Sequence, residues 1–188
     1  MILALVLIAG TLLWAGGEIA MLAAGGIMPT PGWIATLGLY VAGAGCFALK
    51  DLPAVARPGR VGIVLVAFGA ISFATVMTIV LTSGLLGAMA EGAVGHAQMV
   101  YTPFYLLALV FMVAGLVALA LHFRAAPGPQ GAFWGAALLA VLTLARLVFA
   151  SLPLYHEAVS ALVALYLLWL GVIALRRTTA QSTGRGAG

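Results

Sequence analysis

Residues 61–85 read VGIVLVAFGAISFATVMTIVLTSGL, and no charged side chain interrupts them. A helix needs ~20 mostly apolar residues to cross the hydrocarbon core of a bilayer, at about 1.5 Å of rise per residue. In lipid the backbone must satisfy its own hydrogen bonds, which leaves helices and closed barrels as spanning structures. Barrel strands alternate apolar and polar residues, and this stretch does not. It therefore predicts a transmembrane helix.

Five other apolar runs are long enough to be interpreted in the same way. Together with the first, they predict helices at about residues 2–24, 33–49, 61–85, 103–121, 133–152 and 158–175. Proline and glycine between the runs, as in Arg57-Pro58-Gly59-Arg60, mark the turns. Residues 178–188 are small, polar and basic, and we expect a disordered cytoplasmic tail there. The sequence predicts an all-α integral membrane protein, a compact bundle of six transmembrane helices within residues 1–177.

The composition supports this fold class, because 65% of the 188 residues are hydrophobic and only 6% are charged. A soluble domain carries roughly 25% charged residues, so this chain has too few to cover a water-exposed surface. Eight basic residues against four acidic ones give a net charge of +4. They lie mainly in the connections and the tail, a placement that indicates contact with lipid head groups and argues against nucleic acid as a partner.

The basic residues of the connections fall on one side of the predicted bundle. The connections after the second and fourth helices and the tail contain Lys50, Arg57, Arg60, Arg124, Arg176, Arg177 and Arg185. The opposite connections, 25–32, 87–102 and 153–157, contain no Lys or Arg. Because basic residues favour the cytoplasmic side, we expect both termini inside and anionic lipid head groups as partners at that face. The preference for Arg over Lys indicates a bacterial protein, multi-pass in the cytoplasmic (inner) membrane.

Small residues recur every four positions on three of the predicted helices. In lipid such spacing lets helices approach closely, since packing replaces the hydrophobic effect there. The stripes are Gly38, Ala42 and Cys46; Ala114 and Ala118; and Ala132, Ala136 and Ala140. They indicate close packing, and leave a homo-oligomer or another membrane protein open as partner. A shift of 69 residues aligns Pro58-Gly59 with Pro127-Gly128, which fits either a weak hairpin repeat or a chance match.

Two ionisable residues, Glu18 and Arg146, lie inside apolar runs. Each costs about 2.5–3.5 kcal/mol to insert and would face the interior of the bundle. They lie ~25 Å and ~20 Å along their helices from the cytoplasmic side, at similar depth in the outer part of the membrane. We expect them to pair or to converge on a common ligand. The simpler alternatives are a structural ion pair, or an arginine that extends to the membrane surface.

Further polar residues in the predicted outer connections suggest a polar vestibule above these two charges. They are Glu91, His96, Tyr155, His156 and Glu157. His96 and His156 are weak candidates for a metal site, because no spacing typical of metal ligands surrounds them. No nucleophile, phosphate-binding or cofactor motif is present, and a single cysteine excludes an intrachain disulfide. We predict no catalytic residue and no cofactor.

Three functions remain open on the sequence alone. The sequence favours a non-catalytic structural or accessory component of the membrane. The first alternative is a small transporter or permease-like protein with an outward-facing polar site at Glu18 and Arg146, although its prolines do not interrupt a matched pair of helices in mid-membrane. The second is a membrane enzyme acting at the outer surface. A solvent-connected cavity that reaches both charges would favour transport or ligand binding.

Overall fold

The computed structural model describes residues 1–51, 57–87, 93–125, 131–149 and 154–184, together with Pro129 and Leu152. The side chains of residues 51, 85–87, 93–99 and 181–184 are not described. The described chain is helical and contains no strand, which confirms the predicted all-α class. Its elements are α1 (Ile2–Ala24), α2 (Pro29–Gly45), the 3₁₀ helix η1 (Cys46–Asp51), α3 (Arg57–Gly87), α4 (Ala93–Ala125), α5 (Ala132–Ala145) and α6 (Tyr155–Gly184).

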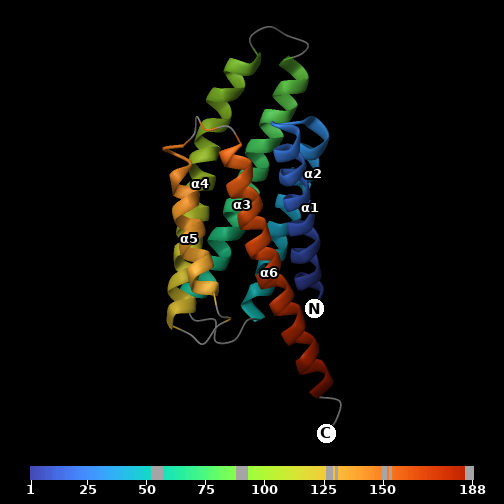
Figure 1. Ribbon diagram of the computed structural model, residues 1–188, viewed down its shortest axis with the longest axis vertical. Helices are drawn as coiled ribbons and strands as arrows, with labels where there is room; N and C mark the ends of the chain where they lie inside the picture. The colour runs from blue at the N-terminus through green and yellow to red at the C-terminus, as the bar shows by residue number, and fades with distance from the viewer. Residues whose placement is uncertain are drawn as a thin grey trace.

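The helices run alternately up and down, so both termini lie at the same end of the molecule (Figure 1). We call this the lower end, and the end with the α1–α2, α3–α4 and α5–α6 connections the upper end. Each helix packs against the next in chain order, and α6 returns to α1. The six helices thus enclose a common interior. The α3–α4 hairpin projects above the other helices, and α6 extends below them (Figure 1).

Five helices are long and apolar enough to cross a membrane, and α5 is the shorter one. The sequence predicts a helix to residue 152, but α5 ends at Ala145 after 14 residues. The chain then tightens, because the N–H groups of Arg146, Leu147 and Val148 each bond to the carbonyl three residues earlier. These turns let the Arg146 side chain reach the main-chain oxygen of His156 at the start of α6.

Other helices begin earlier than their apolar runs predict. α2 begins at Pro29 instead of residue 33, because the fixed φ of proline and its missing N–H suit the first turn of a helix. α3 begins at Arg57, and α4 at Ala93, ten residues before the predicted start at Pro103. The helices that the predicted repeat would superimpose differ in length, with 17 residues in α2 and 33 in α4. The structure therefore gives that repeat no support.

α6 continues to Gly184, where the sequence predicts a disordered tail from residue 178. The hydroxyls of Thr178 and Thr179 donate to the carbonyl of Leu175, so these polar residues satisfy the helix backbone instead of disrupting it. The end of the predicted tail, 185–188, lies outside the described residues.

α1 and α2 approach closely enough that only glycine fits at their contact. A Cβ atom on Gly38 would lie 2.2 Å from the backbone nitrogen of Trp14, and one on Gly10 would lie 2.3 Å from that of Ala42. All three residues of the predicted stripe, Gly38, Ala42 and Cys46, are buried, and so are the alanines predicted on α5.

The stripe predicted on α4 is wrong, because Ala114 is exposed and Ala118 half-buried. Gly115 faces α3 instead, and a Cβ atom there would lie 2.7 Å from the backbone nitrogen of Val66. Small residues flank Gly115 on several sides of α4, so spacing alone selected the wrong face.

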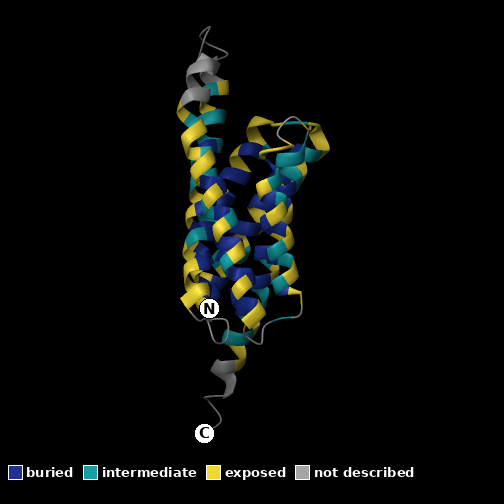
Figure 2. Cartoon of the chain, turned by 90° about the vertical axis from the view of Figure 1, so that its left-hand side faces the viewer, coloured by how far each residue is buried: buried dark blue, intermediate teal, exposed yellow. Residues whose placement is uncertain are grey.

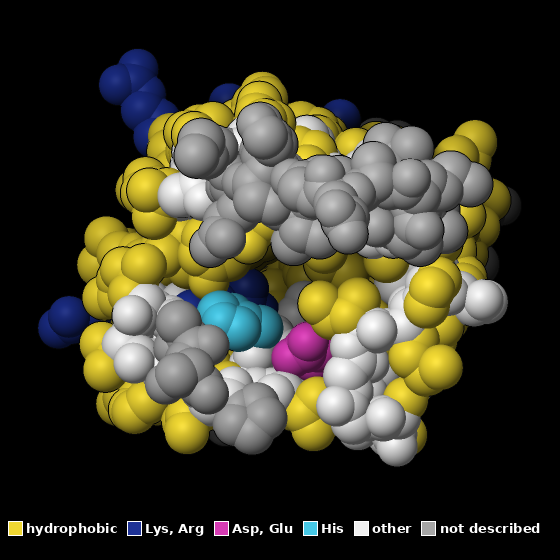
Figure 3. Space-filling model, turned by 90° about the horizontal axis from the view of Figure 1, so that it is seen from above, with side chains coloured by type: hydrophobic (Ala, Val, Ile, Leu, Met, Phe, Trp, Pro, Cys, Tyr) yellow, Lys and Arg dark blue, Asp and Glu magenta, His cyan; other side chains and the backbone are white. Residues whose placement is uncertain are grey.

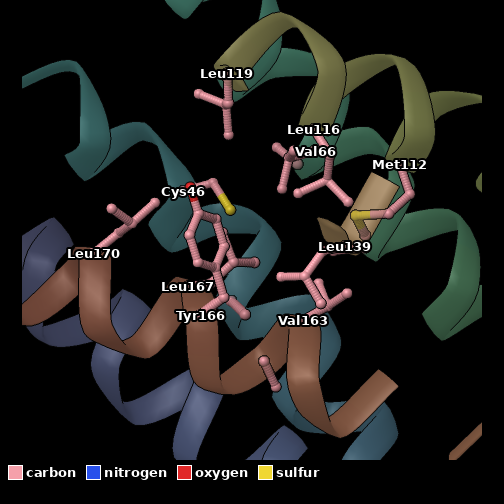
Figure 4. Packing of buried hydrophobic residues seen from close by; sticks show 14 of the residues in the cluster. Cys46, Val66, Met112, Leu116, Leu119, Leu139, Val163, Tyr166, Leu167 and Leu170 are labelled. Carbon is pink, nitrogen blue, oxygen red and sulfur yellow. The ribbon is translucent and has the colours of Figure 1, made fainter. Parts of the chain in front are cut away.

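Buried residues lie on the inner faces of the helices and exposed residues on the outer faces (Figure 2). Many of the exposed residues are large and apolar. Below the middle of the molecule the filling is mostly apolar, with Thr11 and His122 as buried polar exceptions. Figure 4 shows part of the apolar filling: Cys46, Val66, Met112, Leu116, Leu119, Leu139, Val163, Tyr166, Leu167 and Leu170. We call this set the lower core. On the outside, Trp134 is 73% exposed and Val141 65% exposed. An apolar exterior of this kind suggests a membrane-spanning protein.

Candidate functional site

A cavity of about 420 Å³ lies in the upper half of the interior, above the lower core. Side chains from α1, α2, α3, α4 and α6 line it, together with Arg146 and Leu147 just beyond α5. Its walls are mostly apolar, with Leu39, Phe73 and Met77 among them. Seen from above, acidic, basic and histidine side chains gather at a hollow in this face (Figure 3). We call this space the upper cavity.

Glu18 enters the upper cavity from α1 and is 4% exposed. Its Oε1 accepts a hydrogen bond of 2.6 Å from the Ser160 hydroxyl of α6 and one of 3.2 Å from Trp14 Nε1. Trp14 lies one helical turn before Glu18, on the same face of α1, and its Nε1 also donates to Ser160 Oγ at 2.9 Å. Trp14 and Ser160 thus hold the Oε1 atom of Glu18 between α1 and α6.

Arg146 faces the same cavity from the end of α5 and is 5% exposed. Its Nη2 donates to the main-chain oxygen of His156 at 2.9 Å, and its Cζ lies 5.1 Å from the ring centroid of Phe73, within reach of a cation–π interaction. Within the part of the chain that the structure describes, its Nε is buried without a hydrogen-bond partner, as is the hydroxyl of Thr143 one turn earlier. The guanidinium is therefore incompletely hydrogen-bonded. Each buried polar group left unpaired in this way costs about 1–3 kcal/mol of folding free energy.

Glu18 and Arg146 share the cavity but make no ion pair in the described structure, because each is held by partners of its own. The two charges attract one another across the space without contact. Of the two alternatives that the sequence leaves, direct pairing and convergence on a common ligand, the first has no contact to support it. The second stays a prediction.

The other predicted site residues separate into three groups. His156 and Glu157 line the upper cavity, and the His156 Nδ1 lies 3.4 Å from the Tyr105 hydroxyl. Tyr155 instead donates to the carbonyl of Leu142 at 3.0 Å, a contact that ties the start of α6 to α5. Glu91 and the side chain of His96 lie outside the described residues.

The predicted metal site has no support in the part of the chain that the structure describes. No group of three His, Cys, Asp or Glu side chains there lies close enough to hold a metal ion. The side chain of His96, one of the two histidines predicted for that site, lies outside the described part of the structure.

The sequence interpretation missed Trp14, which hydrogen-bonds to Glu18 and Ser160, and three side chains that line the cavity, Phe73, Tyr105 and Ser160. The spacing of Trp14 and Glu18, one helical turn apart, is a signal that could have found the first. Phe73 has no such signal, since an aromatic residue in an apolar helix faces lipid as readily as the interior.

The cavity combines an apolar wall with one buried cation, one buried anion and several neutral hydrogen-bonding groups. Pockets for small molecules have this character and volumes of about 300–1,000 Å³. The Ser160 hydroxyl donates to a carboxylate and not to a histidine, unlike the nucleophile of a serine hydrolase. No known protein family, curated protein or solved structure matches this chain. Any proposal for the function of this protein therefore rests on the geometry of the cavity.

Proposed function

We propose that this chain is a six-helix transmembrane protein that binds a small amphipathic molecule in the upper cavity. The cavity would face the outside of a bacterial inner membrane, with both termini in the cytoplasm. The observation that carries the proposal is that Glu18 and Arg146, both buried, line one cavity of about 420 Å³ without contacting each other.

The energetics of buried charges favour binding over a structural role. A charge in an apolar interior is costly unless it is paired and hydrogen-bonded. A structural ion pair would bring the carboxylate and the guanidinium together, whereas here the space between them is large enough for a small molecule. A bound molecule that contacts both groups would supply the missing partners.

The distribution of basic residues supports the proposed orientation. Lys50, Arg57, Arg60, Arg124 and Arg176 all lie toward the lower end, with the termini. Basic residues favour the cytoplasmic side of a membrane, which leaves the upper cavity on the outside. The positive lower end would meet anionic lipid head groups there.

A binding protein fits the interior better than an open permeation path. The lower core fills the interior beneath the cavity with buried apolar side chains, among them Val66, Leu116 and Leu167. A permease-like function would require this core to separate during each cycle. The binding site is common to both versions, and its existence is what can be tested first.

The test uses cysteines on one face of α3. Met77 lines the upper cavity, and Ala70 lies two turns earlier, fully buried in the core. The natural Cys46 is buried and gives little background. We expect a charged, membrane-impermeant thiol reagent, added outside intact cells, to label Met77→Cys much faster than Ala70→Cys. Octanol should slow the labelling of Met77→Cys, but not that of Met28→Cys, because Met28 lies in the connection between α1 and α2 and is 47% exposed.

Equal labelling rates for Met77→Cys and Ala70→Cys would show that the cavity is not open to the outside, and would contradict the proposed function. Labelling that neither octanol nor a charged octyl compound (octanoate, octylamine or α-aminooctanoic acid) slows would show an open cavity with no affinity for an amphipathic molecule. Either result would return the structural or accessory role to first place.

A further inference from the structure

We propose that the upper cavity selects a zwitterion: its anionic group contacts Arg146, its ammonium group contacts Glu18, and its apolar part packs against α3. This inference rests on the proposed binding function and names the chemical class of the ligand. Both charged side chains are more than nine-tenths buried, and each leaves part of its hydrogen-bonding capacity unused.

In the described structure, neutral side chains hold the carboxyl group of Glu18. The hydroxyl of Ser160 and the indole N–H of Trp14 both donate to Oε1, and both are neutral groups. Within the described structure, Oε2 accepts no hydrogen bond, and no Lys, Arg or His side chain forms an ion pair with this carboxylate. An ammonium group of a ligand would supply the opposite charge.

The guanidinium of Arg146 is likewise incomplete. Nη2 reaches a main-chain oxygen, and Nε is buried with no partner. Guanidinium groups bind carboxylate and phosphate through two parallel N–H···O bonds. An anionic group in the cavity could accept from the guanidinium N–H groups that face it, while the Phe73 ring supports the guanidinium through its Cζ contact.

The other charged and titratable groups that line the cavity are Glu157, Tyr101, Tyr105 and His156. Glu157 lines it from the first turn of α6, and the hydroxyl of Tyr105 and the ring of His156 lie together at 3.4 Å. Glu157 therefore adds negative charge to the cavity. A molecule with only an anionic group would leave Glu18 unpaired, and one with only an ammonium group would leave Arg146 unpaired.

The apolar wall defines the rest of the ligand. Val76, Met77 and Val80 of α3 line the cavity on successive turns. A cavity of about 420 Å³ has room for a single small molecule. An α-amino acid with a long apolar side chain, or the head group of a zwitterionic phospholipid with part of its chain, has this combination of charges and apolar surface.

The test compares four probes that share one octyl-type chain: octanol, octanoate, octylamine and α-aminooctanoic acid. The reporter is the emission of Trp14, which contacts Glu18, in a protein where Trp33, Trp134 and Trp169 are changed to Phe. We expect the zwitterion to bind about tenfold more tightly than either singly charged probe, since a hydrogen bond to a charged group contributes about that factor. This ranking needs no change to Glu18 or Arg146.

Two variants then assign the contacts. Glu18→Gln keeps an acceptor for Ser160 and Trp14, so it should fold, and it should bind octanoate as tightly as the zwitterion. Arg146→Gln should bind octylamine as tightly as the zwitterion. If octanoate or octylamine equals the zwitterion on the unchanged site, the zwitterion proposal is wrong and the binding function stands. If none of the four probes changes Trp14 emission or the labelling of Met77→Cys, both proposals fail.

The source of the zwitterion is distinguished in nanodiscs with and without phosphatidylethanolamine. If the phospholipid head group is the natural occupant, the affinity for α-aminooctanoic acid falls when that lipid is present. An affinity independent of the lipid indicates a free solute. Both results support a zwitterion site and differ only in where the molecule comes from.

Discussion

At the scale of single residues, the hydrogen bonds of Glu18 separate its structural contribution from its charge. Glu18→Gln retains an oxygen that accepts from Ser160 and Trp14, so we expect little loss of stability. Glu18→Leu removes that acceptor and should destabilise the protein by about 1–3 kcal/mol. Thermal unfolding in detergent, followed by circular dichroism, measures both. Equal losses in the two variants would mean that the charge, and not the hydrogen bonds, stabilises this region.

Exchanging the two charges should not restore what the single changes damage. Glu18 is held by Ser160 and Trp14, whereas Arg146 is held by the His156 carbonyl and the Phe73 ring. Because these partners are not interchangeable, Glu18→Arg combined with Arg146→Glu should be no more stable than either single variant. Size-exclusion chromatography after heating gives the comparison. A double variant that recovers the parent's stability would show that the two residues do pair.

The sequence could identify these two residues but not their contacts. A charged residue within an apolar run is conspicuous, and counting along each helix correctly predicts that Glu18 and Arg146 share one end of the molecule. Whether they touch depends on the rotation of α1 and on the early end of α5. Both are set by packing among several helices, and no single apolar run contains that information.

At the scale of helices, α1 offers a matched pair of glycines for testing the close contact with α2. A methyl group on Gly10 would lie 2.3 Å from the backbone nitrogen of Ala42, whereas one on Gly16 would meet nothing within 4 Å. We expect Gly10→Ala to cost about 1–3 kcal/mol through overpacking. Gly16→Ala should be neutral or should stabilise by up to about 1 kcal/mol through helix propensity. Thermal unfolding of both variants decides, and similar melting temperatures would contradict the close approach.

The helix ends show where the sequence pattern stops being informative. An apolar run predicts the part of a helix that avoids water, but a helix continues wherever its backbone is satisfied. α4 therefore begins ten residues before Pro103, and α6 passes through Thr178 and Thr179. α5 differs in the other direction, because the turns after Ala145 bring Arg146 into the interior. The early end of α5, seven residues before the predicted one, thus lies beside the candidate site.

At the scale of the whole molecule, the interior divides into two halves with different chemistry. The lower core is packed with apolar side chains, while the upper cavity has space and unpaired polar groups. Stability can thus come from the lower half, which leaves the upper half free to hold charges that contribute little to it. Substitutions of the charged residues should therefore affect ligand binding more than they affect the stability of the fold.

The orientation of the whole molecule gives the last prediction. Met28 lies in the α1–α2 connection at the upper end and is 47% exposed, and Thr179 lies on the part of α6 that extends below the other helices. If the basic lower end is cytoplasmic, an impermeant thiol reagent should label Met28→Cys in intact cells. It should label Thr179→Cys only after the membrane is opened. The reverse pattern would place the upper cavity inside, where its ligand would have to be a cytoplasmic molecule. Labelling of both sites in intact cells would contradict the transmembrane bundle, because the five helices α2 to α6, which lead from Met28 to Thr179, should place the two sites on opposite sides of the membrane.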